Sequence, residues 1–323
     1  MNALLQELDT AIKIRGIRKN VLREQVENMQ NLPKISIVTP AYKSSSTIEQ
    51  TIRSVVSQDY PNFEYIVVDG AGDDTAQILE KYVDNIHWWC SEPDDGQYDA
   101  VLKGFSRSTG DILCWINADD RLLPDALRIV GEVFADFPNV DWISSLLPGS
   151  YDAQGLYSGH SRISGFSKPA FLDGFFLPGT RRRGSWIQQE STFFRKSIFA
   201  ALNDPFKGCR LAGDFALWCQ LYETSDLVGI TYPLAGFRHI AGQRSEDMSS
   251  YLHEARGALA DLRKVEGYVV GGRLVETVAR LSKYIRVGSK TRKRIGYDGE
   301  KIIKDRHRHP DASWKLEKYK FLI

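Results

Sequence analysis

Between residues 34 and 146, short hydrophobic runs alternate with longer segments whose apolar residues recur at helical spacing. The hydrophobic runs predict strands at 34–39, 63–68, 86–90, 112–116 and 140–146. The amphipathic segments predict helices at 48–57, 75–82, 99–106 and 124–134. Strands that alternate with helices form a parallel sheet, and such strands are continuously hydrophobic because both of their faces are buried. The pattern therefore predicts an α/β fold with a mostly parallel central sheet flanked by helices.

The remaining segments are less regular. Residues 1–32 place leucine and isoleucine near helical spacing, which predicts an N-terminal helical extension. Residues 147–187 are rich in Gly, Ser, Pro and aromatic residues, and a loop-rich segment of this length is usually functional or mobile. Further helices are predicted at 191–202, 216–222 and 248–265, and short strands at 227–230 and 234–239.

Composition and charge narrow the class of protein. The 323 residues are 42% hydrophobic and 26% charged, as in ordinary globular proteins. A net charge of +1 gives no overall attraction to nucleic acid or membrane. The four cysteines form no C-x-x-C pair, so neither a disulfide framework nor a zinc site is indicated, and a cytoplasmic location is expected. We expect no membrane span and no signal peptide, because no apolar run is long enough.

Polar residues follow three of the predicted strands, at the point where each strand ends. The residues are Thr39, Pro40, Ala41 and Tyr42 after the first strand, Asp69, Gly70 and Asp73 after the second, and Asn117, Asp119 and Asp120 after the fourth. The carboxyl ends of strands in an open α/β sheet meet at the ligand-binding edge. Gathered carboxylates repel one another unless a cation lies among them, and Mg²⁺ or Mn²⁺ takes one or two carboxylates together with phosphate oxygens. This edge predicts a nucleotide diphosphate site, although Asp119–Asp120 could instead cap the following helix.

Two blocks of sequence carry a family resemblance. The block SIVTPAYKSSSTIEQTIRSVVSQDYPNFEYIVVDGAGDDT resembles the start of a family 2 glycosyltransferase with the GT-A fold, and EPDDGQYDAVLKGFSRSTGDILCWINADDRLLPDAL resembles the middle of that family. The resemblance implies a GT-A domain at 34–245, with a nucleotide-binding half at 34–146 and an acceptor-binding half at 147–245. Residues 1–33 and 246–323 are then expected to be helical extensions, the second of them basic.

The resemblance implies roles for the residues of the donor side. Thr39, Pro40, Ala41 and Tyr42 would line the base and ribose pocket, Asp69 would bind the base, and Asp99 and Lys103 would approach the diphosphate and sugar. Asn117-Ala118-Asp119-Asp120 matches the metal-binding D-x-D region, with Asn at its first position. Metal binding, as Mn²⁺ or Mg²⁺, is therefore expected at Asp119 or Asp120. Leu102 stands where the family often has Asn, so one donor contact is expected to be missing.

Further blocks imply the catalytic and acceptor residues. LAGDFALW resembles the family segment that carries the catalytic base, which implies that Asp214 is the base. Inverting transfer needs one such carboxylate. The structural alternative is that Asp214 caps the following helix. QQESTFFR resembles the acceptor-side block and implies Gln189 and Glu190 there, unless Glu190 supports Arg195. In FRHIAGQRS, Arg238 or Arg244 could meet the diphosphate, and His239 could bind metal. Arg238 and His239 are adjacent, and adjacent side chains of a strand point to opposite faces. This geometry would turn His239 away from the face of Arg238, so it favours a structural role for His239.

The expected activity is inverting transfer of a sugar from a UDP-, GDP- or dTDP-linked donor to a hydroxyl of a glycan or lipid-linked acceptor, in bacterial surface polysaccharide synthesis. Two alternatives are a sugar-nucleotide pyrophosphorylase and a non-catalytic nucleotide or glycan binder. From Arg280 onward the chain has roughly 14 basic and 5 acidic residues, which is typical of a solvated surface or of peripheral contact with anionic lipid. Nucleic-acid binding is not expected, because the tail shows no motif for it.

Overall fold

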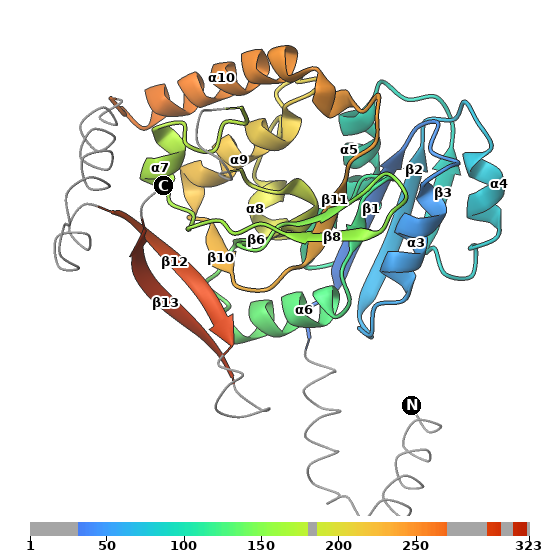
Figure 1. Cartoon of the computed structure of the whole chain (residues 1–323), viewed down its shortest axis with the longest axis horizontal. Helices are drawn as coiled ribbons and strands as arrows, with labels where there is room; N and C mark the ends of the chain where they lie inside the picture. The colour runs from blue at the N-terminus through green and yellow to red at the C-terminus, as the bar shows by residue number, and fades with distance from the viewer. Residues whose placement is uncertain (1–31, 180–185, 270–295, 305–312, 322–323) are drawn as a thin grey trace, which may run out of the picture.

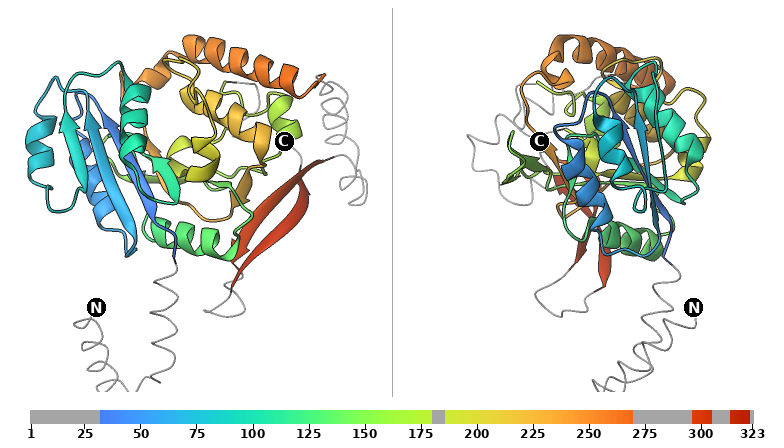
Figure 2. Two further views of the ribbon diagram at one scale, coloured as in Figure 1. Left: turned by 180° about the vertical axis from the view of Figure 1, so that it is seen from behind. Right: turned by 90° about the vertical axis from the view of Figure 1, so that its right-hand side faces the viewer.

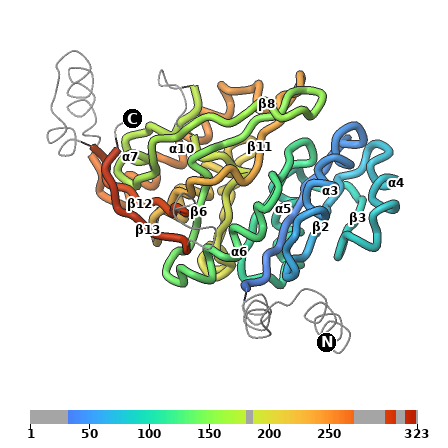
Figure 3. Tube along the Cα trace, turned by 60° about the horizontal axis from the view of Figure 1, so that its bottom comes forward, coloured from blue at the N-terminus to red at the C-terminus, as the bar shows by residue number. Residues whose placement is uncertain are grey.

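The computed structural model describes residues 32–179, 186–269, 296–304 and 313–321 (Figure 1). Within these ranges, the strands form a nine-stranded sheet in the order β13-β12-β10-β6-β9-β4-β1-β2-β3, and a four-stranded sheet in the order β5-β11-β7-β8. Figure 3 places β12 and β13 at the opposite end of the molecule from β3 and α4, as the strand order requires. The predicted N-terminal extension at 1–33 falls almost entirely outside the described residues.

The first half of the chain confirms the predicted alternation. Its strands are β1 (Ile35–Ala41), β2 (Phe63–Asp69), β3 (Trp88–Ser91), β4 (Ile112–Trp115) and β6 (Trp142–Ser145). Its helices are α3 (Ile48–Val56), α4 (Thr75–Glu80), α5 (Gln97–Arg107) and α6 (Ala126–Asp136). Strands β4, β1, β2 and β3 are parallel neighbours, and the register sets Ala41 beside Asp69 and Asp69 beside Ser91. The carboxyl ends of these strands therefore lie at one edge, where the sequence predicts the site.

The predicted helix at 191–202 is wrong in its first part. The segment contains a 3-10 turn, η1 (Gln189–Ser191), then strand β9 (Thr192–Arg195), and only then helix α8 (Lys196–Ala200). Strand β9 lies between β4 and β6 and is antiparallel to both. Thr-Phe-Phe is β-branched and aromatic, as strands favour, but a strand of four residues is too short to be separated from a helix by periodicity.

The loop-rich segment supplies part of the second sheet. It contains β7 (Gly149–Tyr151), β8 (Tyr157–His160) and α7 (Lys168–Leu172). Strand β7 pairs with β11 (Ala235–Arg238), and β11 also pairs with the two-residue strand β5 (Arg121–Leu122), which the sequence did not predict. The predicted helix at 216–222 and strand at 227–230 are confirmed as α9 (Gly213–Thr224) and β10 (Val228–Ile230). A short 3-10 turn, η2 (Arg244–Glu246), follows β11.

The C-terminal extension is not helical throughout. Helix α10 (Met248–Val265) confirms the prediction and lies on the outside of the molecule in each view (Figure 2), but the chain ends in β12 (Tyr297–Lys304) and β13 (Trp314–Phe321). Strand β12 is parallel to β10, so this segment joins the main sheet. Its buried Ile302 and Trp314 stand among Lys and Glu residues, and this high charge hides the strand pattern. The run Arg292–Arg294 lies outside the described residues.

Two hydrophobic clusters fill the two faces of the main sheet. Adjacent residues of β1 point to opposite sides, so Val38 belongs to the cluster under α5, α7, α9 and α10, whereas Ile37 belongs to the cluster under α3, α4 and α6. On the first face the indole rings of Trp115, Trp218 and Trp142 stack in turn, with centroids 5.9 and 5.7 Å apart. This packing fixes α9 against the ends of β4 and β6. In the described part of the chain, no helix combines the length and hydrophobicity that crossing a membrane requires.

Candidate active site

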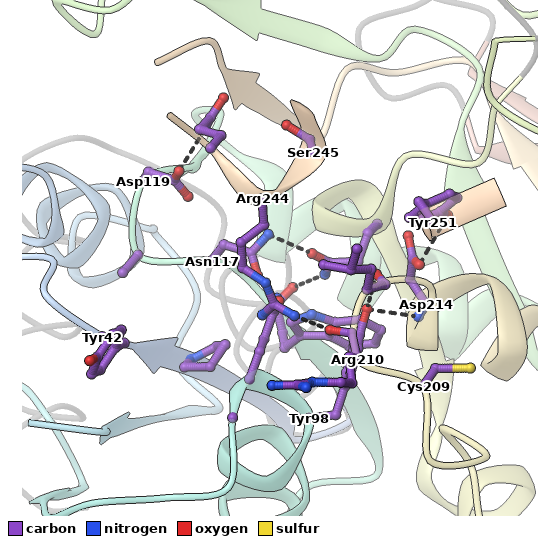
Figure 4. A pocket seen from close by; sticks show the side chains of 18 of the residues that line it. Tyr42, Tyr98, Asn117, Asp119, Cys209, Arg210, Asp214, Arg244, Ser245 and Tyr251 are labelled. Carbon is purple, nitrogen blue, oxygen red and sulfur yellow. Dashed lines mark hydrogen bonds between the residues drawn. The ribbon is translucent and has the colours of Figure 1, made fainter. Parts of the chain in front are cut away.

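A cavity of about 2090 Å³ opens at the carboxyl ends of β1, β2 and β4. Its walls come from the ends of those strands, from α5, η1 and the start of α9, and from the segment between β11 and α10. Figure 4 shows Tyr42 and Asp119 on one side, Asp214 and Tyr251 on the other, and Asn117 and Arg244 between them. The fold thus brings residues that are far apart in the sequence around one space.

The first strand ends at the cavity wall. Pro40, Ala41 and Tyr42 line the cavity, and the Tyr42 ring is 62% exposed, with Lys43 Nζ 5.2 Å from its centroid. Thr39 does not reach the cavity; its hydroxyl lies 3.0 Å from the hydroxyl of Tyr65 in the sheet interior. An exposed aromatic ring above strand ends offers a flat surface on which a planar base can stack.

Asp69 lies directly behind the cavity lining. Its side chain is fully buried, and Oδ2 accepts a 2.6 Å hydrogen bond from Ser91. Within the described residues, Oδ1 has no hydrogen-bond partner. Burial raises the pKa of this carboxyl, partly offset by the Ser91 hydrogen bond. The next residue, Gly70, lines the cavity, whereas Asp69 itself does not.

The adjacent carboxylates Asp119 and Asp120 have different surroundings. Asp119 lines the cavity, and its Oδ2 accepts a 2.7 Å hydrogen bond from Gln243. Asp120 is fully buried, and its oxygens accept hydrogen bonds from the Arg238 amide at 2.9 Å and from Asn117 at 3.1 Å. Burial, together with the charges of Glu190 and Asp119, raises the pKa of Asp120 well above its usual range. Of the two, only Asp119 presents its side chain to the cavity.

Asn117 connects several parts of the site. Its carbonyl oxygen accepts a 2.7 Å hydrogen bond from Gln97, and its amide nitrogen donates to Asp120 and, at 3.2 Å, to Gln189 Oε1. The Gln189 amide donates in turn to the carbonyl of Trp115 at 2.6 Å. An Asp at position 117 could not donate to these oxygens, which explains why an amide stands at the first position of the D-x-D region.

Asp99 and Lys103 occupy different positions on α5. Asp99 lines the cavity near the amino end of the helix, where its carboxylate accepts a 3.3 Å hydrogen bond from the amide of Asp95. Lys103 does not line the cavity and instead forms an ion pair with Glu92. Leu102 does line it, with 37% of its surface exposed. The structure therefore offers Asp99, rather than Lys103, to a ligand.

Asp214 is the second residue of α9 and lines the cavity. Ala212, not Asp214, is the N-cap residue, and a Cβ at Gly213 would lie 2.6 Å from the Tyr98 ring, so only glycine allows this close approach. The Oδ1 atom accepts hydrogen bonds from the Phe215 amide at 2.8 Å and from the Tyr251 hydroxyl at 3.1 Å. Burial raises the pKa of Asp214 to about 6, because these hydrogen bonds only partly offset the desolvation.

Glu190 is a further carboxyl group of the cavity wall. It is 3% exposed, and within the described residues its Oε1 has no hydrogen-bond partner. Burial, followed by the charges of Asp119 and Asp214, raises its pKa to about 8. The alternative that Glu190 supports Arg195 is not what the contacts indicate, since Arg195 donates to the carbonyls of Val140, Phe134 and Phe137.

The two candidate arginines also differ. Arg238 is buried and donates to the Ala153 carbonyl at 2.7 Å and to Gln50 at 3.2 Å, away from the cavity. Arg244 lines the cavity and donates to Gln97 at 2.6 Å and to the Arg210 carbonyl. His239 is exposed, lines the cavity, and packs edge-on against Phe237 at 5.0 Å.

The contacts add residues that sequence reasoning did not select. Gln97 and Gln243 hold Asn117 and Asp119, and Tyr98 and Tyr251 contact Asp214. Gln97 and Tyr98 precede Asp99 in a block that resembles the family, and this position was a signal that could have selected them. Tyr251 had no such signal, because one tyrosine in an amphipathic helix usually belongs to the core.

A divalent cation fits one part of the cavity. Among the described residues, no group of three or more His, Cys, Asp or Glu side chains is arranged to hold a metal by itself. Asp119 nevertheless presents a carboxylate, with His239 also on the wall. Because Mg²⁺ and Mn²⁺ commonly take one or two carboxylates and complete their shell with phosphate and water, these residues fit a cation that arrives with a diphosphate.

Comparisons with known proteins identify the family. An uncharacterized glycosyltransferase of Mycobacterium tuberculosis is 35% identical over 95 residues, 29% of this chain and 36% of that protein. The O-antigen biosynthesis protein RfbC of Myxococcus xanthus is 28% identical over 226 residues, 67% of this chain and 17% of that protein. The chain thus spans about a third of the first relative's length and less of the second's.

Solved structures agree on the fold. The crystal structure of S. aureus TarS 1-349 in complex with UDP-GlcNAc matches with a TM-score of 0.53 at 18% identity, covering 78% of this chain and 74% of that one. This likeness confirms the predicted GT-A fold. A sequence profile described as glycosyl transferase family 2 matches residues 36–201, about half of the chain. The chain belongs to glycosyl transferase family 2.

Proposed function

We propose that this protein transfers a sugar from a nucleotide-diphosphate sugar to a hydroxyl group, with inversion at the anomeric carbon. One observation carries the proposal: Asp119, at the end of β4, and Asp214, at the start of α9, line the same cavity. The first carboxylate suits a cation bound to a diphosphate, and the second suits a general base.

The donor would lie along the strand ends. Tyr42 would stack on the base beside Pro40 and Ala41, and the unpaired Oδ1 of Asp69 would accept a hydrogen bond from it. Asp119 would hold Mn²⁺ or Mg²⁺, with His239 as a second candidate ligand. When bound, the cation stabilises the negative charge that develops on the leaving diphosphate. Arg244 and Asp99 face the same space, Arg238 and Asp120 support it from behind, and Lys103 lies beside it in an ion pair with Glu92.

Asp214 would act as the base in a single displacement. Its Oδ2 takes the proton of the acceptor hydroxyl while that oxygen forms a bond to the anomeric carbon. The bond from the anomeric carbon to the diphosphate oxygen breaks, and the nucleoside diphosphate leaves with the electron pair. A pKa of about 6 leaves Asp214 mostly ionised at pH 7, as a base must be. Attack from the face opposite the leaving group inverts the configuration, so no second nucleophile is required.

Glu190 suits a different task in this reaction. A pKa of about 8 keeps its carboxyl mostly protonated at pH 7, so it can donate a hydrogen bond to a hydroxyl of the bound sugars. The neighbouring Gln189 contributes indirectly on the acceptor side, because its amide is occupied by Asn117 and by the Trp115 carbonyl. The unpaired oxygen of Glu190 is therefore the better candidate for direct contact.

The acceptor is proposed to be a glycan or lipid-linked sugar in bacterial surface polysaccharide synthesis. The cavity exceeds the usual size of a small-molecule pocket, roughly 300–1,000 Å³, and so has room for donor and acceptor together. RfbC is named for O-antigen biosynthesis, which supports this class of product. A cytoplasmic enzyme with peripheral membrane contact fits such an acceptor, and the exposed Lys318 and Lys320, which share one face of β13, would face anionic lipid.

Calorimetry and turnover test the proposal together. UDP, GDP and dTDP are titrated with and without Mn²⁺, and the matching sugar nucleotides are screened for release of nucleoside diphosphate. We expect Mn²⁺ to strengthen the binding of one of the three nucleotides. The sugar nucleotide that carries the same nucleotide should be hydrolysed slowly in the absence of acceptor. A nucleotide affinity that is the same with and without Mn²⁺ would contradict the proposed donor site. Binding without any turnover favours a non-catalytic binder, and formation of sugar 1-phosphate and nucleoside triphosphate on addition of pyrophosphate favours a pyrophosphorylase.

A further inference from the structure

Helix α10 lies beyond residues 36–201, the part of the chain that matches the family profile, yet it contacts the proposed base. The helix packs against α9 through Ala255, Ala258, Leu259 and Leu262, which belong to the hydrophobic cluster that also contains Trp218. Tyr251 and Glu254 stand three residues apart, so they share one face of the helix near the start of α9. Both point at the segment that carries Asp214 (Figure 4 shows Tyr251).

Glu254 holds the chain just before Asp214. Its carboxylate accepts hydrogen bonds from the backbone amides of Arg210 at 3.2 Å, Leu211 at 2.9 Å and Ala212 at 2.8 Å. Burial alone would raise the pKa of Glu254, but these amides more than offset burial and lower it. The negative charge therefore stays on Glu254, and the turn into α9 is fixed from the side of α10.

Tyr251 makes the two oxygens of Asp214 unequal. The Oδ1 atom accepts both the Tyr251 hydroxyl at 3.1 Å and the Phe215 amide at 2.8 Å. Neither of these donors reaches Oδ2, and within the described residues no side chain donates a hydrogen bond to it. The carboxylate thus has one occupied oxygen and one that is free to accept a proton in the cavity.

We propose that Tyr251 is a positioning residue that holds Oδ1 of Asp214 and thereby presents Oδ2 to the acceptor hydroxyl. The inference rests on the proposed function, since it assumes that Asp214 is the base. It extends the catalytic machinery from α9 to α10, both of which lie beyond the matched residues 36–201. Tyr98 completes the arrangement from the opposite side, because its hydroxyl accepts from the Asp214 amide at 3.3 Å and donates to the Leu211 carbonyl at 2.7 Å.

The other charged and titratable groups around Asp214 come from several elements. They are Tyr98 on α5, Glu190 on η1, Cys209 before α9, Arg244 on η2, and Tyr251 with Glu254 on α10. Removal of the Tyr251 hydroxyl leaves the other groups in place. Because that hydroxyl donates to the ionised carboxylate, its loss must favour the protonated form and raise the pKa of Asp214.

The test compares Tyr251→Phe with Tyr222→Phe in the full-length protein. Tyr222 is a matched control, because it lies on α9 and its buried hydroxyl has no hydrogen-bond partner within the described residues. The pKa of Asp214 is read from the ¹³C carboxyl signals of aspartate-labelled protein, with the Asp214 signal identified by its loss in Asp214→Asn. We expect Tyr251→Phe to raise this pKa by roughly half a unit, and Tyr222→Phe to leave it unchanged.

Turnover is measured beside the titration. We expect Tyr251→Phe to lower kcat about tenfold, to leave KM for the donor near its original value, and to shift the acidic limb of the pH profile upward. An unchanged Asp214 pKa in Tyr251→Phe overturns the inference, and so does unchanged kcat. The absence of turnover in the unmodified protein would instead overturn the proposed function, since the titration needs no substrate. Tyr251→Leu, which also lacks the hydroxyl, is the second variant and should raise the Asp214 pKa in the same direction.

Discussion

The two sides of the cavity are built in different ways. On the donor side, the positions of Ala41 and Asp69 follow from a parallel ladder, in which neighbouring strands end in register. On the base side, Asp214 is positioned by its amide, which donates to the Tyr98 hydroxyl, and by the Tyr251 hydroxyl, which donates to its carboxylate; these tyrosines lie 116 and 37 residues away in the chain. One side depends on the backbone of a regular sheet, and the other on side chains that meet only after the whole chain has folded.

Asp119 and Asp120 show the same contrast over two residues. The buried Asp120 organises its surroundings, since it accepts hydrogen bonds from Arg238 and Asn117, whereas Asp119 faces the cavity. Two adjacent carboxylates can therefore have different roles: Asp120 stabilises the loop, and Asp119 is available to a ligand. The difference between them, and between the two sides of the cavity, can be tested by substitution.

The largest effect is expected on the base side. Asp214→Asn keeps the shape and an oxygen for Tyr251 but cannot accept a proton, so transfer should fall by about 10³-fold, within the range of general base catalysis. The affinity for nucleoside diphosphate should stay the same, because that affinity belongs to the donor side. Rates with saturating donor and calorimetric affinities measure the two quantities separately.

The stability of Asp214→Asn provides a check. Because burial raises the folded-state pKa of Asp214 from 3.8 to about 6, the charged form destabilises the fold as pH rises through this window. The variant should therefore be at least as stable as the original protein at pH 7 in urea unfolding. A folded variant that retains turnover would remove Asp214 as the base.

The next largest effect is expected at Asp119. Asp119→Asn should weaken Mn²⁺-dependent nucleotide binding by roughly 10- to 100-fold, as expected when a charged contact is lost, and should leave metal-free binding unchanged. Asp120→Asn is the matched comparison, because it changes the neighbouring carboxylate in the same way. It should lower the free energy of unfolding, since one buried donor loses its acceptor. If Asp120→Asn left the protein stable but abolished the effect of Mn²⁺ on nucleotide binding, Asp120 rather than Asp119 would be the metal ligand.

The donor side was also the more predictable from sequence. Strands β1, β2, β3 and β4 were recognisable because each is a hydrophobic run that ends in polar residues, and the resemblance then implied what those residues do. Burial of individual side chains was beyond such reasoning: Thr39 and Arg238 lie behind the cavity and Lys103 beside it, on elements that were predicted correctly. Which face of an element a residue occupies depends on the exact register.

Long-range pairing explains the remaining errors. Strand β9 is antiparallel among parallel strands, and it is recognisable only when its neighbours β4 and β6 are in place. Strands β12 and β13 carry Lys and Glu on exposed positions and join the sheet through β10. Tyr251 lies in a helix that was predicted, yet only packing of α10 on α9 reveals its contact with Asp214.

Asn117 tests how tightly the two sides are joined. In Asn117→Asp, a carboxylate would face the oxygens of Asp120 and Gln189, where the amide now donates. We expect a loss of about 2 kcal/mol in the free energy of unfolding, the cost of replacing buried hydrogen bonds by repulsion. The loss should shrink at low pH, where the new carboxyl is protonated, and the double variant Asn117→Asp with Asp120→Asn should recover part of it. A single variant as stable as the original protein would contradict the network.

The smallest effect is the pH dependence of the rate. Because the base must be ionised, kcat should fall about tenfold per pH unit below pH 6 and level off above it, in line with an Asp214 pKa raised to about 6 by burial. Nucleotide affinity measured without metal between pH 5 and 7 should stay flat, since the proposed base makes no contact with the nucleotide. If affinity and kcat fell together, the titrating group would belong to the donor side. A limb in kcat alone would place the proton transfer at the carboxylate that Tyr251 holds, and so separate the two sides of the cavity by chemistry as well as by construction.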